Sequence, residues 1–128
     1  MLNMYLAVAA GGAVGSLGRY LFVGGSARWL GVGFPWGTLG VNVLGSLLMG
    51  AAAGWFAIRA SLPPELQAFV TVGMLGGFTT FSAFSWDMVH LYERGQVVLA
   101  LVYGTASLGL SLGALILGLA FTRKFIAG

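Results

Sequence analysis

Four long apolar stretches, separated by short connections rich in Gly, Pro and charge, limit what this chain can fold into more than any other feature. Each stretch is long enough for a helix to cross roughly 30 Å of hydrocarbon. The connections are too short to hold a soluble domain. We therefore expect one all-α membrane domain over residues 1–128. Its four transmembrane helices are expected at about residues 4–23, 38–58, 66–91 and 97–121.

The composition excludes most soluble classes of protein. Of 128 residues, 59% are hydrophobic and 7% are charged, where an average soluble domain carries about 25% charged residues. The six basic residues are scattered singly and form no phosphate-binding patch, so no nucleic acid partner is expected. Because cysteine is absent, disulfides, thiolate metal sites and thiol catalysis are excluded. The lipid bilayer is the expected surrounding.

The basic residues are divided evenly between the two expected membrane faces. One face collects Arg59, Arg123 and Lys124, and the other collects Arg19, Arg28 and Arg94. The positive-inside rule therefore gives no orientation. Copies inserted in both directions would follow, and with them an antiparallel, dual-topology homodimer. The alternative is a single orientation, weakly favoured by the C-terminal charges.

Glycines recur at helical spacing. Pairs four residues apart inside the spans include Gly11 and Gly15, Gly50 and Gly54, and Gly109 and Gly113. Small residues at this spacing let membrane helices approach closely. We expect these positions to pack against other helices of the chain or against a second subunit.

Polar side chains form two stripes inside the expected spans. Neutral hydroxyl and amide donors along one passage suit an anion that must also leave, because they bind it without a fixed charge. The alternative is hydrogen bonding between helices or back to the carbonyl four residues earlier. The stripes are Thr38, Asn42 and Ser46 in the second span, and Tyr103, Ser107 and Ser111 in the fourth.

The third span is unusual because its centre, Gly73–Ser85, is rich in glycine and threonine. We expect the helix to break there, in mid-membrane, where freed carbonyls need a protein partner or a cavity. Hard carbonyl oxygens with no carboxylate nearby in sequence favour Na⁺ over Ca²⁺ or Zn²⁺, and two copies meeting at the break would complete the coordination shell. Phe81 and Phe84 share a helix face near the break, so their ring edges either attract an anion or simply pack in a core.

Three motifs resemble those of the fluoride channel family called Fluc or CrcB. They are the run Gly76–Ser85, the opening Gly37–Asn42 of the second span, and Gly11–Gly15 leading to Arg19. The resemblance extends from about Leu6 to Leu119. It implies passive, selective fluoride export across the cell inner (cytoplasmic) membrane. It also implies an antiparallel homodimer with two pores and a structural Na⁺ at the subunit interface.

By matching position, the resemblance implies a role for individual residues. The backbone carbonyls of Gly76 and Thr79 would bind Na⁺, and Arg19 would lie in the aqueous vestibule. Fluoride would pass Asn42, Phe81, Phe84, Tyr103, Ser107 and Ser111. Two positions depart from the family pattern: Asp87 stands where a glutamate is expected, and Phe78 where a leucine is expected.

Three other classes remain as alternatives. A small proton-coupled multidrug exporter would have the same size and topology, but it needs a carboxylate in the first helix, which this chain lacks. An enzyme would depend on the lone His90 together with Asp87, and His90 is better interpreted as an interfacial polar residue. A packing subunit of a larger complex would explain the glycines but not the broken third span.

Overall fold

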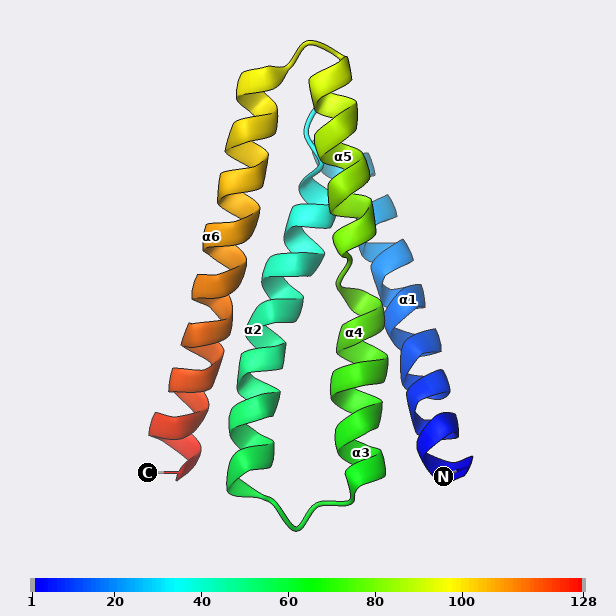
Figure 1. Ribbon diagram of the computed structural model, residues 1–128, viewed down its shortest axis with the longest axis vertical. Helices are drawn as coiled ribbons and strands as arrows, with labels where there is room; N and C mark the ends of the chain where they lie inside the picture. Colours follow the sequence, from blue (N-terminus) through cyan, green and yellow to red (C-terminus); the bar gives the residue numbers. More distant parts are fainter. Residues whose placement is uncertain (1, 128) are drawn as a thin grey trace.

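The structure is a computed structural model that describes residues 2–127, and over this range it is all-helical without strands. Four helices are long and apolar enough to cross a membrane (Figure 1). The first is α1 (Leu2–Leu30) and the second α2 (Trp36–Ile58). The third comprises α3 (Pro64–Ala68), the π-helical η1 (Phe69–Leu75), α4 (Gly76–Phe78) and α5 (Phe81–Glu93), and the fourth comprises α6 (Val97–Thr122) and η2 (Arg123–Ala127).

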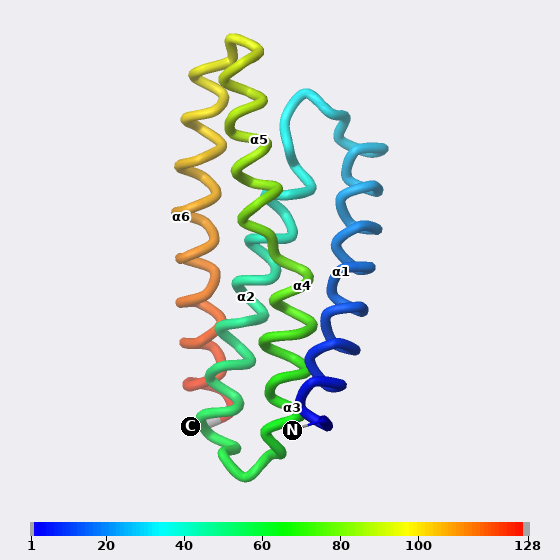
Figure 2. The backbone as a smooth tube through the Cα atoms, turned by 45° about the vertical axis from the view of Figure 1, so that its right-hand side comes forward, coloured from blue at the N-terminus to red at the C-terminus, as the bar shows by residue number. Residues whose placement is uncertain are grey.

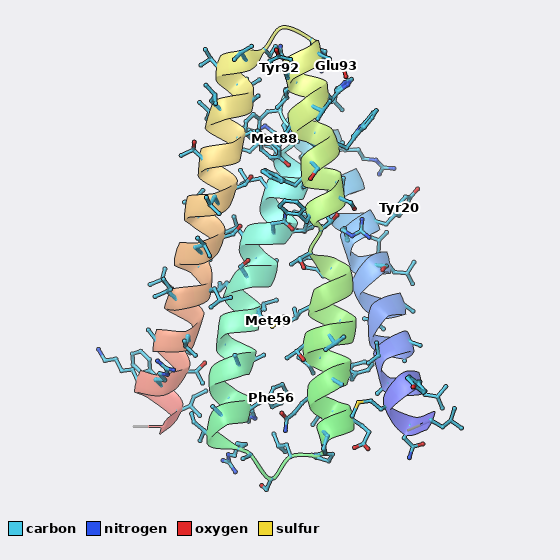
Figure 3. All side chains as sticks on the ribbon, viewed as in Figure 1. Tyr20, Met49, Phe56, Met88, Tyr92 and Glu93 are labelled. Carbon is cyan, nitrogen blue, oxygen red and sulfur yellow. The ribbon has the colours of Figure 1, made fainter. Side chains whose placement is uncertain are left out.

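The four helices stand side by side, with both chain ends at the same end of the bundle (Figure 1). The third helix and α2 lie between α1 and α6 in both views of the backbone (Figures 1 and 2). Tyr92 and Glu93 mark the opposite end (Figure 3). Both chain ends lie at one end of the bundle because the chain crosses it an even number of times through short turns.

The first helix is longer than the span predicted from the sequence. It runs through Gly24 and Gly25, where we had expected a connection to begin, and ends at Leu30. Glycine weakens a helix chiefly by its backbone entropy and by exposing the backbone to water, and an apolar environment removes the competing water. The helix ends instead at Gly31, whose φ of +81° is a left-handed value that favours glycine.

Two glycines of α1 pack directly against the third helix. A Cβ at Gly11 would lie 2.9 Å from the Met74 nitrogen, and one at Gly15 would lie 2.9 Å from the Phe78 nitrogen. The backbones of the two helices therefore touch without intervening side chains, as predicted from the spacing of these glycines. This contact fixes α1 against the segment that contains the break.

The contact between α2 and α6 is built in the same way. A Cβ at Gly50 would meet the Leu115 carbonyl, and one at Gly118 would lie 2.8 Å from the Ala51 nitrogen. The Thr122 hydroxyl, 1% exposed, donates to the carbonyls of Ala51 at 3.1 Å and Gly118 at 3.0 Å. The two helices are thus held together at one end of the bundle.

The third glycine pair behaves differently. Apart from the adjoining backbone of α6 and the neighbouring residues, no atom of the described chain lies within 4 Å of a Cβ built at Gly109 or Gly113. The expectation of close packing within the chain is therefore wrong for this pair. Contact with a second subunit, the other expected option, stays a prediction.

Candidate functional site

The third helix is interrupted at two consecutive threonines. The backbone is extended at both, with φ and ψ of −87° and 158° at Thr79 and −152° and 123° at Thr80. The Thr80 side chain accepts a hydrogen bond of 3.1 Å from the Ala83 N–H, so Thr80 is the N-cap of α5. The interruption falls within the glycine- and threonine-rich run singled out in the sequence.

Asn42 on α2 reaches across to the interruption and binds its backbone twice. Its Nδ2 donates to the Thr80 carbonyl at 3.0 Å, and its Oδ1 accepts from the Thr80 N–H at 2.8 Å. The Asn42 amide thus forms hydrogen bonds with both main-chain groups of Thr80, the N–H and the carbonyl. The sequence placed Asn42 on the polar stripe but gave no indication of this partner, 38 residues away.

Two carbonyls at the interruption lose the donors that a continuous helix would supply. In such a helix the amide of residue i+4 donates to carbonyl i. The Thr80 N–H donates to Asn42 instead of Gly76, and the Ala83 N–H donates to the Thr80 hydroxyl instead of the Thr79 carbonyl. Free, uncharged carbonyl oxygens fit a monovalent cation such as Na⁺. Gly76 and Thr79 are the two positions that the family resemblance assigns to it.

A third carbonyl, that of Gly77, is satisfied by Arg19. The Arg19 Nε donates to this carbonyl at 3.1 Å. Arg19 lies within α1 and lines neither of the two cavities described below, and its expected place in a vestibule stays a prediction.

A cavity of about 330 Å³ opens beside the break, between α2 and α6. Five of the six residues predicted for the fluoride path line it, together with Ser46 from the first stripe and Met49, which Figure 3 labels on α2. The five are Asn42, Phe81, Phe84, Ser107 and Ser111. Four of the six stripe residues, Asn42, Ser46, Ser107 and Ser111, thus face one space, whereas Thr38 and Tyr103 do not line it.

Two hydroxyls in this cavity have no partner. The Ser107 and Ser111 oxygens are buried and make no hydrogen bond within the described chain, and Ser107 as a whole is only 6% exposed. Hydrogen bonding to the preceding turn, the alternative interpretation of this stripe, does not occur at either serine. A buried hydroxyl without a partner costs about 1–3 kcal/mol, so these two groups are available to a polar guest.

Both phenylalanines line the cavity, but they differ in surroundings: Phe84 also packs against the core around Tyr103, whereas Phe81 is largely exposed. Their ring centroids are 5.7 Å apart with planes inclined at 45°, and the Phe81 side chain is 79% exposed. An exposed ring beside a cavity is not explained by packing within this chain. Its edge, which carries partial positive charge, remains free to meet an anion.

Tyr103 lies beside the cavity and not in its wall, and its role on the fluoride path stays a prediction. It is fully buried, does not line the cavity, and packs its ring 5.1 Å from that of Phe84. Its hydroxyl donates to Asp87 Oδ2 at 3.0 Å. Asp87 and Thr38 line a second cavity of about 180 Å³, formed with the segment that joins α1 to α2. Sequence reasoning missed this second cavity and left Asp87 without a role.

Four membrane-length apolar helices, an interrupted third helix and a cavity lined by neutral hydrogen-bond donors define a small multi-pass membrane protein with a polar site inside its helix bundle. Nothing in these features requires a water-soluble surface or a bound prosthetic group.

Comparison with known proteins identifies the family. The profile described as CrcB-like protein, Camphor Resistance (CrcB), matches residues 6–119. The fluoride-specific ion channel FluC of Nitrobacter winogradskyi is 55% identical over 118 residues, which cover 92% of this chain and 94% of that protein. The FluC proteins of Rhodospirillum centenum and Granulibacter bethesdensis are 51% and 49% identical, over 98% and 97% of this chain and 100% and 98% of their own lengths. The chain belongs to the CrcB family, and the resemblance noted in the sequence is confirmed.

Proposed function

We propose that this protein is a fluoride-specific ion channel of the bacterial inner membrane that releases fluoride passively from the cell. Its relatives carry that name over nearly their full lengths. The observation that carries the proposal in this chain is the pair of buried, unpartnered serine hydroxyls facing Asn42 and two phenylalanine rings across one cavity. The protein is an ion channel and not an enzyme.

The chemistry of the cavity suits a small, strongly hydrated anion. Fluoride gives up its water only if several donors replace it, and it leaves again only if none binds too strongly. The hydroxyls of Ser107 and Ser111 supply neutral donors, and the rings of Phe81 and Phe84 supply edges with partial positive charge. The path runs along this wall, and the positive charge of Arg19 stays outside it.

The working unit is an antiparallel homodimer. Support comes from the exposure of Phe81 and from the cavity itself, which a single chain leaves open at one side. A two-fold axis in the membrane plane exchanges the two membrane faces, so a site on that axis can meet its copy only at mid-depth. Thr79 and Thr80 lie close to the middle of the apolar helix Pro64–Glu93, as such an axis requires.

A structural Na⁺ lies on this axis and joins the two breaks. The carbonyls of Gly76 and Thr79 are without their helical donors, and a second copy supplies the same two. Four uncharged oxygens balance one positive charge without the strong field that would draw a divalent cation. The ion's role is to hold the two interrupted helices together at a fixed geometry.

Fluoride efflux from liposomes that contain the purified protein tests the channel. We expect fast fluoride release at a fluoride electrode, with chloride retained in the same vesicles, and loss of release in Phe81→Ile. Phe121→Ile is a matched control, because Phe121 is also exposed, at 57%, but lies on α6 away from the cavity. Folded protein that releases no fluoride refutes the proposal.

The dimer is tested separately by its topology. In each chain both ends lie at one end of the bundle (Figure 1). Two copies inserted in opposite directions therefore place a C-terminal tag on opposite sides of the membrane, and the tag is accessible from both sides. Labelling from one side only refutes the antiparallel arrangement and leaves the fluoride proposal standing.

A further inference from the structure

The two hydrogen bonds between Asn42 and Thr80 do more than attach α2 to the third helix. The Thr80 N–H is the donor that a continuous helix would give to the Gly76 carbonyl. Asn42 Oδ1 holds that N–H at 2.8 Å, while Nδ2 holds the Thr80 carbonyl at 3.0 Å. The backbone of Thr80 is thereby fixed in an extended conformation and turned away from Gly76.

We propose that Asn42 is a positioning residue for the cation site: by engaging both main-chain groups of Thr80, it keeps the Gly76 carbonyl free for Na⁺. The inference rests on the sodium site of the proposed function and adds to it the residue that maintains the site. Since Asn42 also lines the fluoride cavity, one side chain joins the two sites.

The other side-chain hydrogen bonds described at the break do not hold the Thr80 N–H away from the Gly76 carbonyl. The Thr80 hydroxyl accepts from Ala83 and so frees the Thr79 carbonyl, but it leaves the Thr80 N–H untouched. Arg19 binds the Gly77 carbonyl, which is not one of the two proposed ligands. Thr79 donates, from its N–H at 3.1 Å and its hydroxyl at 3.0 Å, to Leu75, before the break. Among the residues that the structure describes, only Asn42 accepts the N–H that a continuous helix would give to Gly76.

Replacement of Asn42 has a defined consequence. In Asn42→Ala the Thr80 N–H has lost its acceptor, and in a re-formed helical turn it would donate to the Gly76 carbonyl. Asn42→Ser has the same effect, because the serine side chain is one bond too short to hold both Thr80 groups. Asn42→Ser nevertheless keeps a hydroxyl toward the cavity, which makes it the second variant if Asn42→Ala does not fold.

The test compares thermal stability in sodium chloride with that in N-methyl-D-glucamine chloride. An ion that binds only the folded protein raises the Tm with its concentration, and the four tryptophans supply an intrinsic fluorescence signal. We expect a sodium-dependent rise in Tm for the full-length protein and its loss in Asn42→Ala and Asn42→Ser. Ser46→Ala is the matched control: it lies one turn further along the same face of α2 and lines the same cavity, but makes no hydrogen bond to the break. It should keep the full rise.

The outcomes separate the two proposals. A variant whose Tm falls equally in both salts and keeps its sodium-dependent rise has lost only packing, and it overturns the role of Asn42 alone. An unmodified protein that releases fluoride but shows no sodium response overturns both the sodium site and this inference. Loss of the rise in both Asn42 variants, with its retention in Ser46→Ala, supports the assignment.

Discussion

The Tyr103 hydroxyl donates a hydrogen bond of 3.0 Å to the Asp87 carboxylate, and this pair contacts the walls of both cavities described above. The Tyr103 ring packs against Phe84, which lines the larger cavity, while Asp87 lines the smaller one. An anion that moves from one cavity to the other passes close to a carboxylate whose charge is partly compensated by this bond.

We expect Tyr103→Phe to lower fluoride release because it leaves the Asp87 carboxylate without this donor. A hydrogen bond to a charged group is worth about 1.5–3 kcal/mol, so a loss of about tenfold or more in rate is expected at a fluoride electrode. The double variant Tyr103→Phe with Asp87→Asn removes the uncompensated charge and should recover much of the rate. Equal rates in Tyr103→Phe and the unmodified protein would show that the pair does not influence permeation.

Removing an unpartnered serine hydroxyl should have opposite effects on stability and on fluoride release. Ser107→Ala removes a buried hydroxyl that makes no hydrogen bond, so the Tm should stay the same or rise. Fluoride release should fall, because one donor is missing from the cavity wall. The Tm by tryptophan fluorescence and the release rate, measured on one preparation, check both signs.

Thr71→Val is the control for the serine prediction. It also removes a hydroxyl, but this one donates to the Gln67 carbonyl within the third helix, away from the cavity. The release rate of this variant should not change. A fall in rate as large as that of Ser107→Ala would mean that general loosening of the bundle, and not loss of a donor, explains the serine result.

Much of this site could be predicted from helical periodicity. Residues four apart share a face, so the stripes that contain Asn42 and Ser107 were expected to meet, and they do meet in one cavity. The break was predictable from local composition, because glycine and β-branched threonine weaken a helix wherever they occur. These inferences use only neighbours in the sequence.

The features that were missed depend on contacts between distant segments. Arg19 binds Gly77, 58 residues away, and Tyr103 binds Asp87 across the turn between α5 and α6. No periodicity within one helix carries information about which helix lies beside it or at what depth. The same limit applies to Gly109, whose spacing matched that of Gly50 although only Gly50 packs against a helix of this chain.

Gly50→Ala should destabilise the bundle, whereas Gly109→Ala should not do so within a single chain. A Cβ at Gly50 would meet the Leu115 carbonyl, so α2 and α6 must separate to accommodate it. Overpacking of this kind costs about 1–3 kcal/mol. A Cβ at Gly109 would meet no other helix of the described chain within 4 Å. Thermal unfolding of the two variants in detergent measures the difference, and equal losses would contradict the close contact between α2 and α6.

The bond between Arg19 and Gly77 allows the charge of this residue to be separated from its hydrogen bond. Its Nε, not its terminal nitrogens, donates to the carbonyl at 3.1 Å. In glutamine, Nε2 stands at the same distance along the side chain as the arginine Nε, so Arg19→Gln keeps a donor in place and removes the charge. Lysine has a methylene at that position, so Arg19→Lys keeps the charge and loses the bond.

If Arg19 acts by holding the break, Arg19→Gln should retain most of the fluoride release and the Tm, while Arg19→Lys should lose both. If it acts by attracting anions electrostatically, Arg19→Lys should retain the fluoride release and Arg19→Gln should lose it. The higher release rates of the unmodified protein and Arg19→Lys should then decrease as ionic strength rises. We expect the first order, because the guanidinium lines neither cavity and its Nε is committed to the Gly77 carbonyl. Release rates of both variants at about 10 mM and 300 mM salt decide between the two roles, since screening weakens an exposed charge over this range but not a partly buried hydrogen bond.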